Sequence, residues 1–527
     1  MRSIYRAFQA DRWDPPASRS ELEAGSGRSY RPGSRDTTAI EKCIRSFQIL
    51  IGTLLFLVLG SASARAQTAT VTWANEHQTM DGWGAEDWTS AETLTSSQAD
   101  MFFSPTGGIG LEYIRTGNYG CPQTDTCTVS TSNVPDLATL QAAVARGAKI
   151  VAHIVPPAQY QYAGNFYNGT PDPTSGNCIL QSNFSAFANW TVQWIQMLNS
   201  NGATISVLEV ANEPNLNEVD TLGGCVWTAA GLDSYISGYL GPALAAANLT
   251  SVQVMLPTVS FWFSPDFVTT CMNDANCSKY VTIVSGHGYW NGSGSSSVDG
   301  TGTGYCCATA TAAPHSTAGK RVWMDEVNGG FTFDSTAGLW NWDASMADAL
   351  VWAHSIHDYL TIPNVSAWLY WELADCCSSE SGAPFNDGLT QADLSTISKR
   401  YYAIGNWSKF VRSGWIRIDA TANPQGEIYV TAFKDPSSVR FAFIAVNGAS
   451  SDVSQTFSLD GFNPTSVTPW VTSTTLNLAQ QSDVSVSSGD FTFVLPAQSV
   501  TTFVGIADQS SGGTRPASPT QLSATVR

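Results

Sequence analysis

Residues 207–215 read VLEVANEPN and residues 321–330 read RVWMDEVNGG. Each stretch begins with a short run containing several apolar residues and then passes into acidic, Asn, Pro or Gly residues. A short apolar run bounded by turn-forming residues is typical of a buried strand. The two stretches therefore predict strands that are followed directly by the carboxylates of Glu213 and Glu326.

Similar runs recur along residues 78–405, where they alternate with amphipathic stretches. Eight strands are expected, at Met80–Gly84, Leu111–Thr116, Lys149–Val155, Ser206–Ala211, Val252–Pro257, Val281–Ser285, Arg321–Asp325 and Ser366–Trp371. Helices are expected between them, among others at Pro135–Arg146, Asn183–Asn199, Ala229–Ala247 and Ala344–Tyr359. Alternating strands and helices predict a parallel sheet, and eight such units predict a (β/α)8 TIM barrel of the α/β class.

Residues 406–506 follow a different pattern, in which short strands are joined by turns rich in Gly, Asn, Pro and Ser. The expected strands are Trp415–Asp419, Ile428–Lys434, Arg440–Val446, Ser454–Leu459, Val467–Thr472, Phe491–Leu495 and Val500–Gly505. Such a series predicts a C-terminal antiparallel β-sandwich, for which a supporting role is favoured over a binding role. Residues 507–527 are expected to be a linker or tail.

Residues 1–66 are expected to be a leader and signal peptide. The apolar run 47–60 is too short to span a membrane comfortably, and it follows Lys42 and Arg45. The small-x-small sequence at 64–66 provides a cleavage site. The protein is therefore expected to be secreted, either out of the cell or into the periplasm.

The composition excludes several classes of partner. The formal net charge is −18, and an acidic surface repels phosphate backbones, so no nucleic acid is expected. No other segment could span a bilayer, so no membrane partner is expected. The sequence shows no Gly-rich phosphate loop and no Cys/His cluster with zinc spacing, so no cofactor and no metal are expected. A monomer is expected, although the sequence does not determine the oligomeric state.

The cysteines favour disulfides. Of eleven, Cys43 lies in the leader, which leaves an even number in an exported protein. Cys121 with Cys127 and Cys271 with Cys277 are spaced for small local loops, and Cys178 and Cys225 are candidates to bridge two barrel loops. The adjacent doublets Cys306-Cys307 and Cys376-Cys377 allow vicinal bridges or a link to each other, and the sequence leaves this choice open.

The two carboxylates indicate the chemistry. Barrel enzymes carry their catalytic groups where strands end, and Glu213 and Glu326 follow the fourth and seventh predicted strands. Cleaving a glycosidic bond needs one acid to protonate the leaving oxygen and a second carboxylate to attack the anomeric carbon or direct water to it. A single Glu at a strand end is usually only solvated, but the pair predicts a glycoside hydrolase. A retaining enzyme requires a separation of about 5 Å.

Longer motifs resemble glycoside hydrolase family 30. They are MDGWGAEDW (80–88), LEYIRTG (111–117), EVANEPN (209–215), GHGYW (286–290) and VWMDEV (322–327), followed by YYAIGNWSKFVRSGWIRIDATANP (401–424) and LPAQSVTTFVG (495–505). The last two are most similar to the bacterial xylanase and glucuronoxylanase members, and the resemblance covers residues 68–506. It implies a sandwich fused rigidly to the barrel, with an N-terminal strand at residues 67–77 that joins the sandwich.

The resemblance also implies roles for single residues. Glu213 would be the general acid/base, which must hold its proton near neutral pH, and Glu326 the nucleophile. Asn212 would donate to the sugar hydroxyl beside the reacting carbon. Arg115, at the end of the second strand, would hold the nucleophile ionised, and an ordinary barrel salt bridge is the alternative for this residue.

Five aromatic or imidazole side chains are further candidates for substrate contact. Tyr289 and His287 follow the sixth strand and could touch the nucleophile or the sugar, although a lone His is more often structural. Trp371 closes the eighth strand, where the resemblance implies the floor of the sugar subsite. Trp83 and Trp88, near the first strand, could be further platforms for sugar rings, and core packing is an equal alternative.

The sequence departs from the family pattern at two places. The glucuronoxylanases carry an Arg after the eighth strand that pairs with a glucuronate branch, whereas here no base occurs between Trp371 and Lys399. That segment instead holds Glu372, Asp375, Glu380, Asp387 and Asp393. A loop with this charge repels a uronate, so glucuronate is not expected to be required. Ala85-Glu86-Asp87 replaces an expected Gly-rich stretch, and Glu86, Asp87 and Glu372 could bind sugar hydroxyls or tune Glu213.

The first functional hypothesis is an endo-β-1,4-xylanase acting on xylan. The second is another retaining specificity on the same scaffold, either a β-1,6-galactanase or β-1,6-glucanase or an exo-β-xylosidase. Exo action needs a pocket closed by loops, and the Gly/Ser-rich segment 291–319 could close one side. A third hypothesis, from a different class, is a non-catalytic carbohydrate-binding protein, which the presence of both carboxylates disfavours.

Overall fold

A computed structural model describes residues 68–87, 93–121, 126–162, 171–215, 225–262, 265–289, 319–328, 333–334, 339–340, 342–374, 388–391 and 394–508. These residues belong to a compact unit formed by Gln67–Arg527. The predicted leader, Trp88, both cysteine doublets and nearly all of the tail lie outside the described residues. In the described part of the chain, no helix is long and apolar enough to cross a membrane.

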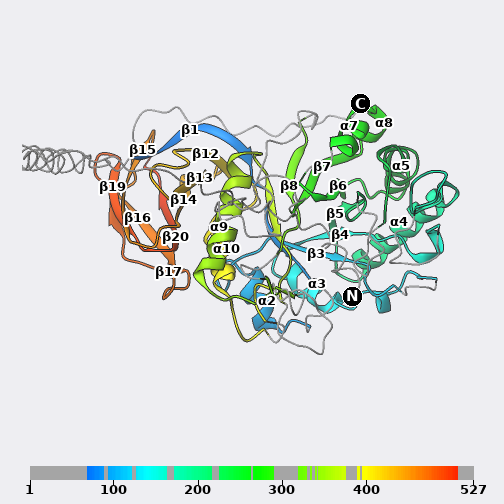
Figure 1. Ribbon diagram of the computed structural model, residues 1–527, viewed down its shortest axis with the longest axis horizontal. Coiled ribbons are helices and arrows are strands. Elements are labelled where there is room, and N and C mark those ends of the chain that lie inside the picture. Colours follow the sequence, from blue (N-terminus) through cyan, green and yellow to red (C-terminus); the bar gives the residue numbers. More distant parts are fainter. Residues whose placement is uncertain are drawn as a thin grey trace, which may run out of the picture. The chain divides into compact units, whose positions relative to one another are not determined.

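Eight parallel strands close a barrel in the order β11-β2-β3-β4-β5-β6-β7-β8 (Figure 1). The strands are β2 (Gly82–Glu86), β3 (Tyr113–Gly117), β4 (Lys149–His153), β5 (Ile205–Glu209), β6 (Gln253–Phe261), β7 (Val281–Tyr289), β8 (Arg321–Met324) and β11 (Ala367–Tyr370). Each corresponds to one predicted strand, so the predicted barrel is confirmed. A separate short ribbon pairs β9 (Phe333–Asp334) with β10 (Leu339–Trp340).

The barrel interior is filled in layers. Its lower layer is an apolar cluster of Tyr113, Val151, Val207, Met255, Ile283, Trp323, Ala367 and Leu369. Side chains alternate between the two faces of a strand, so residues two positions further along point into the same interior. On β3, β4 and β5 those residues are Arg115, His153 and Glu209, and all three are buried. The sequence therefore places a polar layer directly above the apolar one, at the ends of the strands.

The helices surround the barrel. They are α2 (Ser96–Phe103), α3 (Leu137–Val144), α4 (Phe184–Ser200), α5 (Ala229–Tyr235), α6 (Gly241–Ala246), α7 (Pro265–Asn273), α8 (Ala275–Ser278), α9 (Met346–Thr361) and α10 (Lys399–Ser408). The predicted helix at 229–247 is present as α5 and α6 joined by a π-helical turn at Ile236–Leu240. Helix α4 buries Phe187, Trp190 and Trp194 in the core, as its helical spacing predicts.

The C-terminal strands form one sheet with the N-terminal strand β1 (Ala69–Thr79). The others are β12 (Ile416–Ala420), β13 (Ile428–Lys434), β14 (Arg440–Asn447), β15 (Val453–Asp460), β16 (Ser466–Thr472), β17 (Ala479–Gln480), β18 (Val484–Ser485), β19 (Asp490–Leu495) and β20 (Ser499–Ile506). Strand β1 pairs antiparallel with β12 but parallel with β15. The C-terminal strands pair antiparallel with one another, as predicted. The parallel pairing of β1 with β15 makes the sheet mixed.

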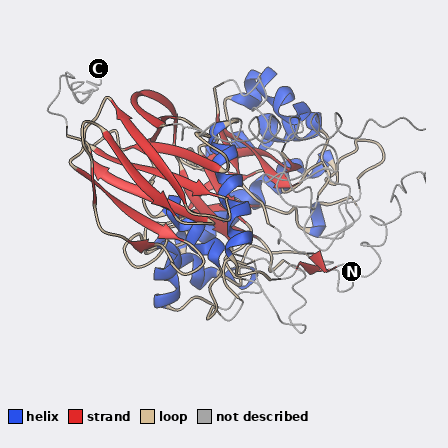
Figure 2. Ribbon diagram, turned by 60° about the vertical axis from the view of Figure 1, so that its left-hand side comes forward, coloured by secondary structure: helices blue, strands red, loops and turns tan. Residues whose placement is uncertain are grey.

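This sheet folds over its own core. Phe443 on β14 lies 5.2 Å from Phe457 on β15 between ring centroids, although β14 and β15 are not neighbours in the sheet. Helices α9 and α10 pack against β13, β16 and β20. Figure 2 shows helices (blue) beside the large sheet (red). Asn406 on α10 donates to Thr502 Oγ1 at 2.9 Å, and Trp407 donates to Thr431 Oγ1 at 3.1 Å. Buried hydrogen bonds therefore join the barrel helices to the sheet.

Among the residues that the structure describes, three disulfides stabilise the loops of the barrel. They link Cys121 to Cys127, Cys178 to Cys225 and Cys271 to Cys277, with Cα–Cα distances of 5.2, 5.5 and 5.2 Å. The first and third are the local pairs that their spacing suggested, and the second is the expected bridge between two barrel loops. The second joins the loop after β4 to the loop after β5, which carries Glu213.

Candidate active site

Arg115 is the centre of the polar layer. Its side chain is fully buried, and all five of its N–H groups have acceptors. Nε and Nη2 donate to the two carboxylate oxygens of Glu209, each at 2.8 Å. Nη2 also donates to Asn212 Oδ1 at 2.9 Å, and Nη1 donates to Glu86 at 2.8 Å and to Glu326 at 2.5 Å. With every donor used, the guanidinium is fixed in one orientation.

Glu326 lies in the loop after β8, and three groups surround its carboxylate. Oε2 accepts from Arg115, and Oε1 accepts from the Tyr289 hydroxyl at 2.9 Å. His287 Nδ1 lies 3.4 Å from Oε1. The side chain is 8% exposed. Cationic and hydrogen-bonding partners stabilise the ionised form of a carboxylate, so this environment suits an anion.

Glu213 lies in the loop after β5 and is less tightly held. Its φ of 44° is in the left-handed region, which is uncommon for a residue with a Cβ, and its backbone N–H donates to Thr258 O at 3.0 Å. Its side chain is 19% exposed, and its Oε1 forms a hydrogen bond with His287 Nδ1 at 2.9 Å. This carboxylate is therefore both anchored and accessible.

The two carboxylates are close together. Oxygen atoms of Glu213 and Glu326 lie within 4.8 Å of each other, with His287 Nδ1 within the same distance of both. Carboxylates of retaining glycosidases are about 5 Å apart, whereas inverting enzymes leave about 6.5–9.5 Å for a water molecule. The spacing is that of a direct nucleophile and its acid partner.

Burial and charge set the protonation of the polar layer. Burial would lower the pKa of His287, but the charge of Glu326 and the hydrogen bond to Glu213 outweigh it and raise the pKa to about 9. Burial raises the pKa of Glu86 to about 7 against the opposing charge of Arg115. Burial likewise raises the pKa of Asp325 to about 7, although the charge of His287 opposes the shift. At neutral pH the layer therefore holds an imidazolium and carboxyls that still bind protons.

Two groups of side chains in the described part of the chain have the spacing of metal ligands. One is Asp233 with Cys271 and Cys277, whose sulfurs are joined in a disulfide and so provide no thiolate. The other is Glu213, His287 and Glu326. A metal-bound histidine must be neutral, and the raised pKa of His287 disfavours that form. Neither group fits a resident metal well.

The other predicted residues are placed as follows. Asn212, beside Glu213, is bound to Arg115, and His287 and Tyr289 lie on β7 rather than after it. Trp371 directly follows β11, two residues after Leu369, whose side chain points into the barrel. By the alternation of the strand its side chain points to the same interior, and its backbone N–H donates to Val327 O at 3.0 Å. Trp83 points away from the barrel interior.

Trp83 is not a platform for a sugar ring in this structure. Its side chain is fully buried, and its indole N–H donates to Val411 O at 2.8 Å. Inward positions on β2 belong to Gly82, Gly84 and Glu86, because Gly82 pairs with Ala367 of the inner layer. The alternative of core packing applies to Trp83, since the alternation of the strand turns its side chain toward the helices.

Three residues of the site were not identified from the sequence. Glu209 forms two hydrogen bonds with Arg115, Tyr119 donates a hydrogen bond to Glu86, and Asp325 lies buried beside the charges of His287 and Arg115. Glu209 had a signal, since a charged residue inside an otherwise apolar strand must have a partner. Glu86 was expected to contact sugar or tune Glu213, but its partners are Arg115 and Tyr119.

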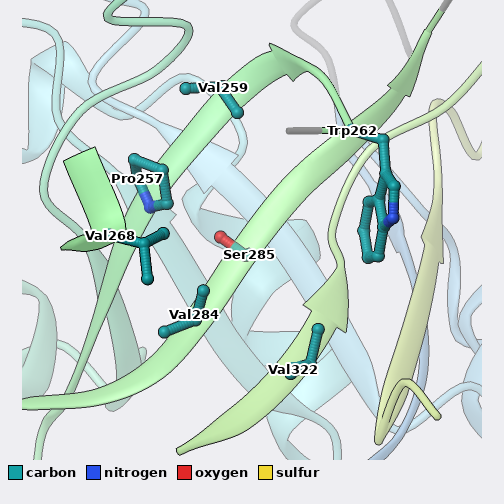
Figure 3. A pocket seen from close by; sticks show the side chains of 7 residues that line it. All are labelled: Pro257, Val259, Trp262, Val268, Val284, Ser285 and Val322. Atoms are coloured by element: carbon teal, nitrogen blue, oxygen red, sulfur yellow. The ribbon is translucent and has the colours of Figure 1, made fainter. Parts of the chain in front are cut away.

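A small cavity lies between β6, β7, β8 and α7 (Figure 3). Its lining is Pro257, Val259, Trp262, Val268, Val284, Ser285 and Val322. Its volume of about 10 Å³ has room for about one water molecule, for which the buried Ser285 hydroxyl is a suitable partner. The cavity is too small for a sugar and includes neither carboxylate of the site.

Comparisons with known proteins agree with this geometry. The model of the glycosyl hydrolase family 30 TIM-barrel domain matches residues 169–382, which include Glu213 and Glu326. Glucuronoxylanase XynC of Bacillus subtilis (strain 168) is 27% identical over 458 residues, 86% of this chain and 96% of the relative.

Solved structures show the same fold. The family 30 subfamily 8 xylanase Xyn30A from Clostridium acetobutylicum aligns with a TM-score of 0.66 and 26% identity, covering 84% of this chain and all of the other.

A second kind of relative is similar in sequence. An endo-1,6-β-D-glucanase of Neurospora crassa is 24% identical over 253 residues, 47% of this chain and 48% of the relative. The family match, the similarity along both domains and the barrel with its two carboxylates lead to one conclusion: the chain is a glycosyl hydrolase that resembles glycoside hydrolase family 30.

Proposed function

We propose that the protein is a secreted, retaining endo-β-1,4-xylanase, with Glu326 as nucleophile and Glu213 as general acid/base. The observation that carries the proposal is the asymmetry of two carboxylates within 4.8 Å of each other. Glu326 is held by Arg115 and Tyr289, which favour an anion, while Glu213 is more exposed and contacts a histidine.

The reaction has two steps. In the first, an oxygen of Glu326 attacks the anomeric carbon, the glycosidic bond breaks, and Glu213 gives its proton to the leaving oxygen. In the second, Glu213 takes a proton from water, whose oxygen attacks the same carbon and releases Glu326. Two inversions leave the anomeric configuration unchanged.

Neighbouring groups support these steps. His287 Nδ1 lies 2.9 Å from Glu213 Oε1, so a protonated imidazole donates to the carboxylate that remains after Glu213 has released its proton. Asn212 uses its amide oxygen to accept from Arg115, which leaves its amide N–H groups for a sugar hydroxyl. Trp371, at the end of β11, provides an aromatic face for the sugar ring.

The substrate proposal rests on relatives and on charge. Of the three similar proteins named above, the two that match over more than four fifths of this chain are a glucuronoxylanase and a xylanase, which supports xylan over a β-1,6-glucan. The first bases after Trp371 are both engaged elsewhere. Lys399 Nζ donates to Asn477 Oδ1 at 2.6 Å, and Arg400 Nε lies 2.8 Å from Asp348 in a buried ion pair. Neither base is available for a uronate, so we propose that a glucuronate branch is not required.

The proposal is tested by product profiling on linear xylan, glucuronoxylan, arabinoxylan and β-1,6-linked glucan and galactan. We expect mixed xylo-oligosaccharides from linear xylan, and NMR should show the β-anomer first. Strict dependence on glucuronate branches would overturn the uronate proposal, and first release of the α-anomer would overturn retention. Cleavage of β-1,6-glucan alone would favour the specificity of the Neurospora relative, and release of xylose alone would favour an exo-β-xylosidase.

A second experiment distinguishes an enzyme from a binding protein. Glu326→Ala should abolish hydrolysis while binding to insoluble xylan persists in a pull-down. Unchanged hydrolysis by this variant would show that Glu326 is not the nucleophile. Secretion is tested separately, by N-terminal sequencing of protein from the culture medium, where we expect Gln67 as the first residue.

A further inference from the structure

Glu86 is the last residue of β2 and points into the barrel beneath the catalytic carboxylates. It is 1% exposed, so it cannot contact a substrate. Its two oxygens have different partners. Oε2 accepts from Arg115 Nη1 at 2.8 Å, and Oε1 accepts from the hydroxyl of Tyr119.

The nitrogen that binds Glu86 also binds Glu326. Arg115 Nη1 carries two N–H groups, one directed to Glu86 and the other to Glu326 at 2.5 Å. Because the guanidinium is planar and rigid, the direction of one N–H group fixes the direction of the other. Glu209 and Asn212 accept from Nε and Nη2. At Nη1, Glu86 accepts from one N–H group and Glu326 accepts from the other.

We propose that Glu86, held by Tyr119, is a positioning residue that orients Arg115 toward the nucleophile. The inference rests on the proposed function of Glu326. Glu86 acts through Arg115 and not on the sugar, so its effect should appear in the chemical step rather than in substrate binding.

The charges around Glu86 are consistent with this role. The titratable and charged groups that face it are Arg115 and Tyr119 from β3 and the following loop, Glu209 on β5, Glu326 after β8, and Asp87, which directly follows it in the chain. The guanidinium of Arg115 contacts three of these acids, Glu86, Glu209 and Glu326. Burial raises the pKa of Glu86 to about 7, so near neutral pH its average negative charge is less than one, and its Oε2 still accepts a hydrogen bond from Arg115.

The test compares Glu86→Ala and Glu86→Gln. Active sites are counted by covalent trapping of Glu326 with an activated 2-deoxy-2-fluoro-β-glycoside of the sugar that the polysaccharide panel identifies, which releases one leaving group per working site. We expect Glu86→Ala to lower kcat per active site about 100-fold, as small misplacements of a catalytic group do, with KM changed less than about threefold. Glu86→Gln should keep kcat within about threefold, because its amide oxygen still accepts from Arg115.

Asp348→Ala is the matched control. Asp348 is also a buried carboxyl paired with an arginine, Arg400 at 2.8 Å, but it lies on α9 outside the barrel. We expect this variant to lose thermal stability while kcat per active site stays unchanged. A drop in kcat equal to that of Glu86→Ala would show that the loss of any buried acid has this effect, and would overturn the proposal.

Other outcomes are equally decisive. If Glu86→Ala keeps the wild-type kcat per active site, or if Glu86→Gln is as impaired as Glu86→Ala, Glu86 does not position Arg115. If Glu86→Ala does not fold, Tyr119→Phe decides, since it removes only the hydroxyl that holds Glu86. It should lower kcat several-fold, and an unchanged kcat would overturn the proposal. A wild-type enzyme that is not trapped at Glu326 would refute the proposed function instead.

Discussion

His287 Nδ1 lies 2.9 Å from Glu213 Oε1, which places a buried imidazole against the more exposed of the two carboxylates of the candidate site. The same nitrogen lies 3.4 Å from Glu326. One protonated ring can therefore face both carboxylates, whose charges change in opposite directions during the first step of the proposed reaction. Four predictions follow from this arrangement and from the groups beneath it.

Replacing His287 should affect catalysis more than binding. His287→Gln removes the cation that faces Glu213, and we expect kcat to fall about tenfold or more, with a smaller change in KM because the side chain is fully buried. The measurement is steady-state kinetics on xylan at pH 6. His354→Gln, a change at another buried histidine on α9, should leave kcat unchanged. Wild-type kcat in His287→Gln would contradict the role of His287.

The two carboxylates should differ in their dependence on the leaving group. Glu213→Ala is expected to lose about 100-fold or more on xylan, but much less on an aryl glycoside with a good leaving group, because such a group departs without a proton. Glu326→Ala should be inactive on both substrates, since neither can form the covalent intermediate. Kinetics with 2,4-dinitrophenyl and unactivated glycosides measure the difference. Equal losses in Glu213→Ala on both substrates would speak against its role as the acid.

Arg115→Lys should impair both stability and activity. Lysine offers three donors in place of five and lacks the planar fork, so acceptors on Glu209, Glu86 and Asn212 lose their partners in a buried site. We expect a loss of about 3–5 kcal/mol in the free energy of unfolding, together with a large fall in kcat. Denaturant unfolding and kinetics measure the two effects.

An exposed arginine provides the control for that substitution. Arg440 lies 3.1 Å from Asp435, and the Arg440 side chain is 63% exposed. Arg440→Lys should therefore cost less than about 1 kcal/mol, because exposed ion pairs contribute little. A similar cost at both positions would mean that burial of Arg115 does not matter.

Stability should fall as pH rises from about 7 to about 9. The pKa of His287 is raised to about 9 from an ordinary 6.5, so the stability from its protonated form is present below 6.5 and is lost as pH rises through 9. Glu86 and Asp325, whose pKa values burial raises to about 7, lose their contribution as pH approaches 7 from below. His153 and His357 have lowered pKa values and oppose this trend only below pH 6.5.

Thermal melts between pH 6.5 and 9.5 measure this dependence. We expect Tm to fall by several degrees over this range in the wild type and much less in His287→Gln. A wild-type Tm that rises toward pH 9 would contradict the sign of the His287 shift. The same melts in His354→Gln should keep the wild-type slope.

Much of the fold followed from local patterns. All eight barrel strands were predicted, because buried parallel strands are short apolar runs separated by amphipathic helices. In the second sheet, the antiparallel pairing of the C-terminal strands was predicted. The orientation of β1 was not, because its parallel pairing with β15 joins residues far apart in the chain. Nothing within residues 69–79 distinguishes a parallel partner from an antiparallel one.

The candidate site was likewise predicted only in part. Glu213 and Glu326 were identified because each follows an apolar strand, and the order of strands in a barrel brings their ends to one face. The contact between Arg115 and Glu326 was expected from the resemblance. The hydrogen bonds of Arg115 to Glu86, Glu209 and Asn212 were not predicted, since they join β2, β3, β5 and the loop beyond β5. Trp83 could not be assigned to core or site until the pairing of β2 fixed which of its faces points inward.

The sequence by itself therefore determined the barrel, the two carboxylates and the class of chemistry, because these depend on periodicity and on the position of a residue along a strand. Only the tertiary structure shows that Arg115 and Tyr289 both bind the carboxylate of Glu326 across the barrel. It also decided that Glu86 faces Arg115 rather than the sugar. Contacts between strands depend on how the closed sheet sets neighbouring strands beside one another, and no single segment of the chain contains that information.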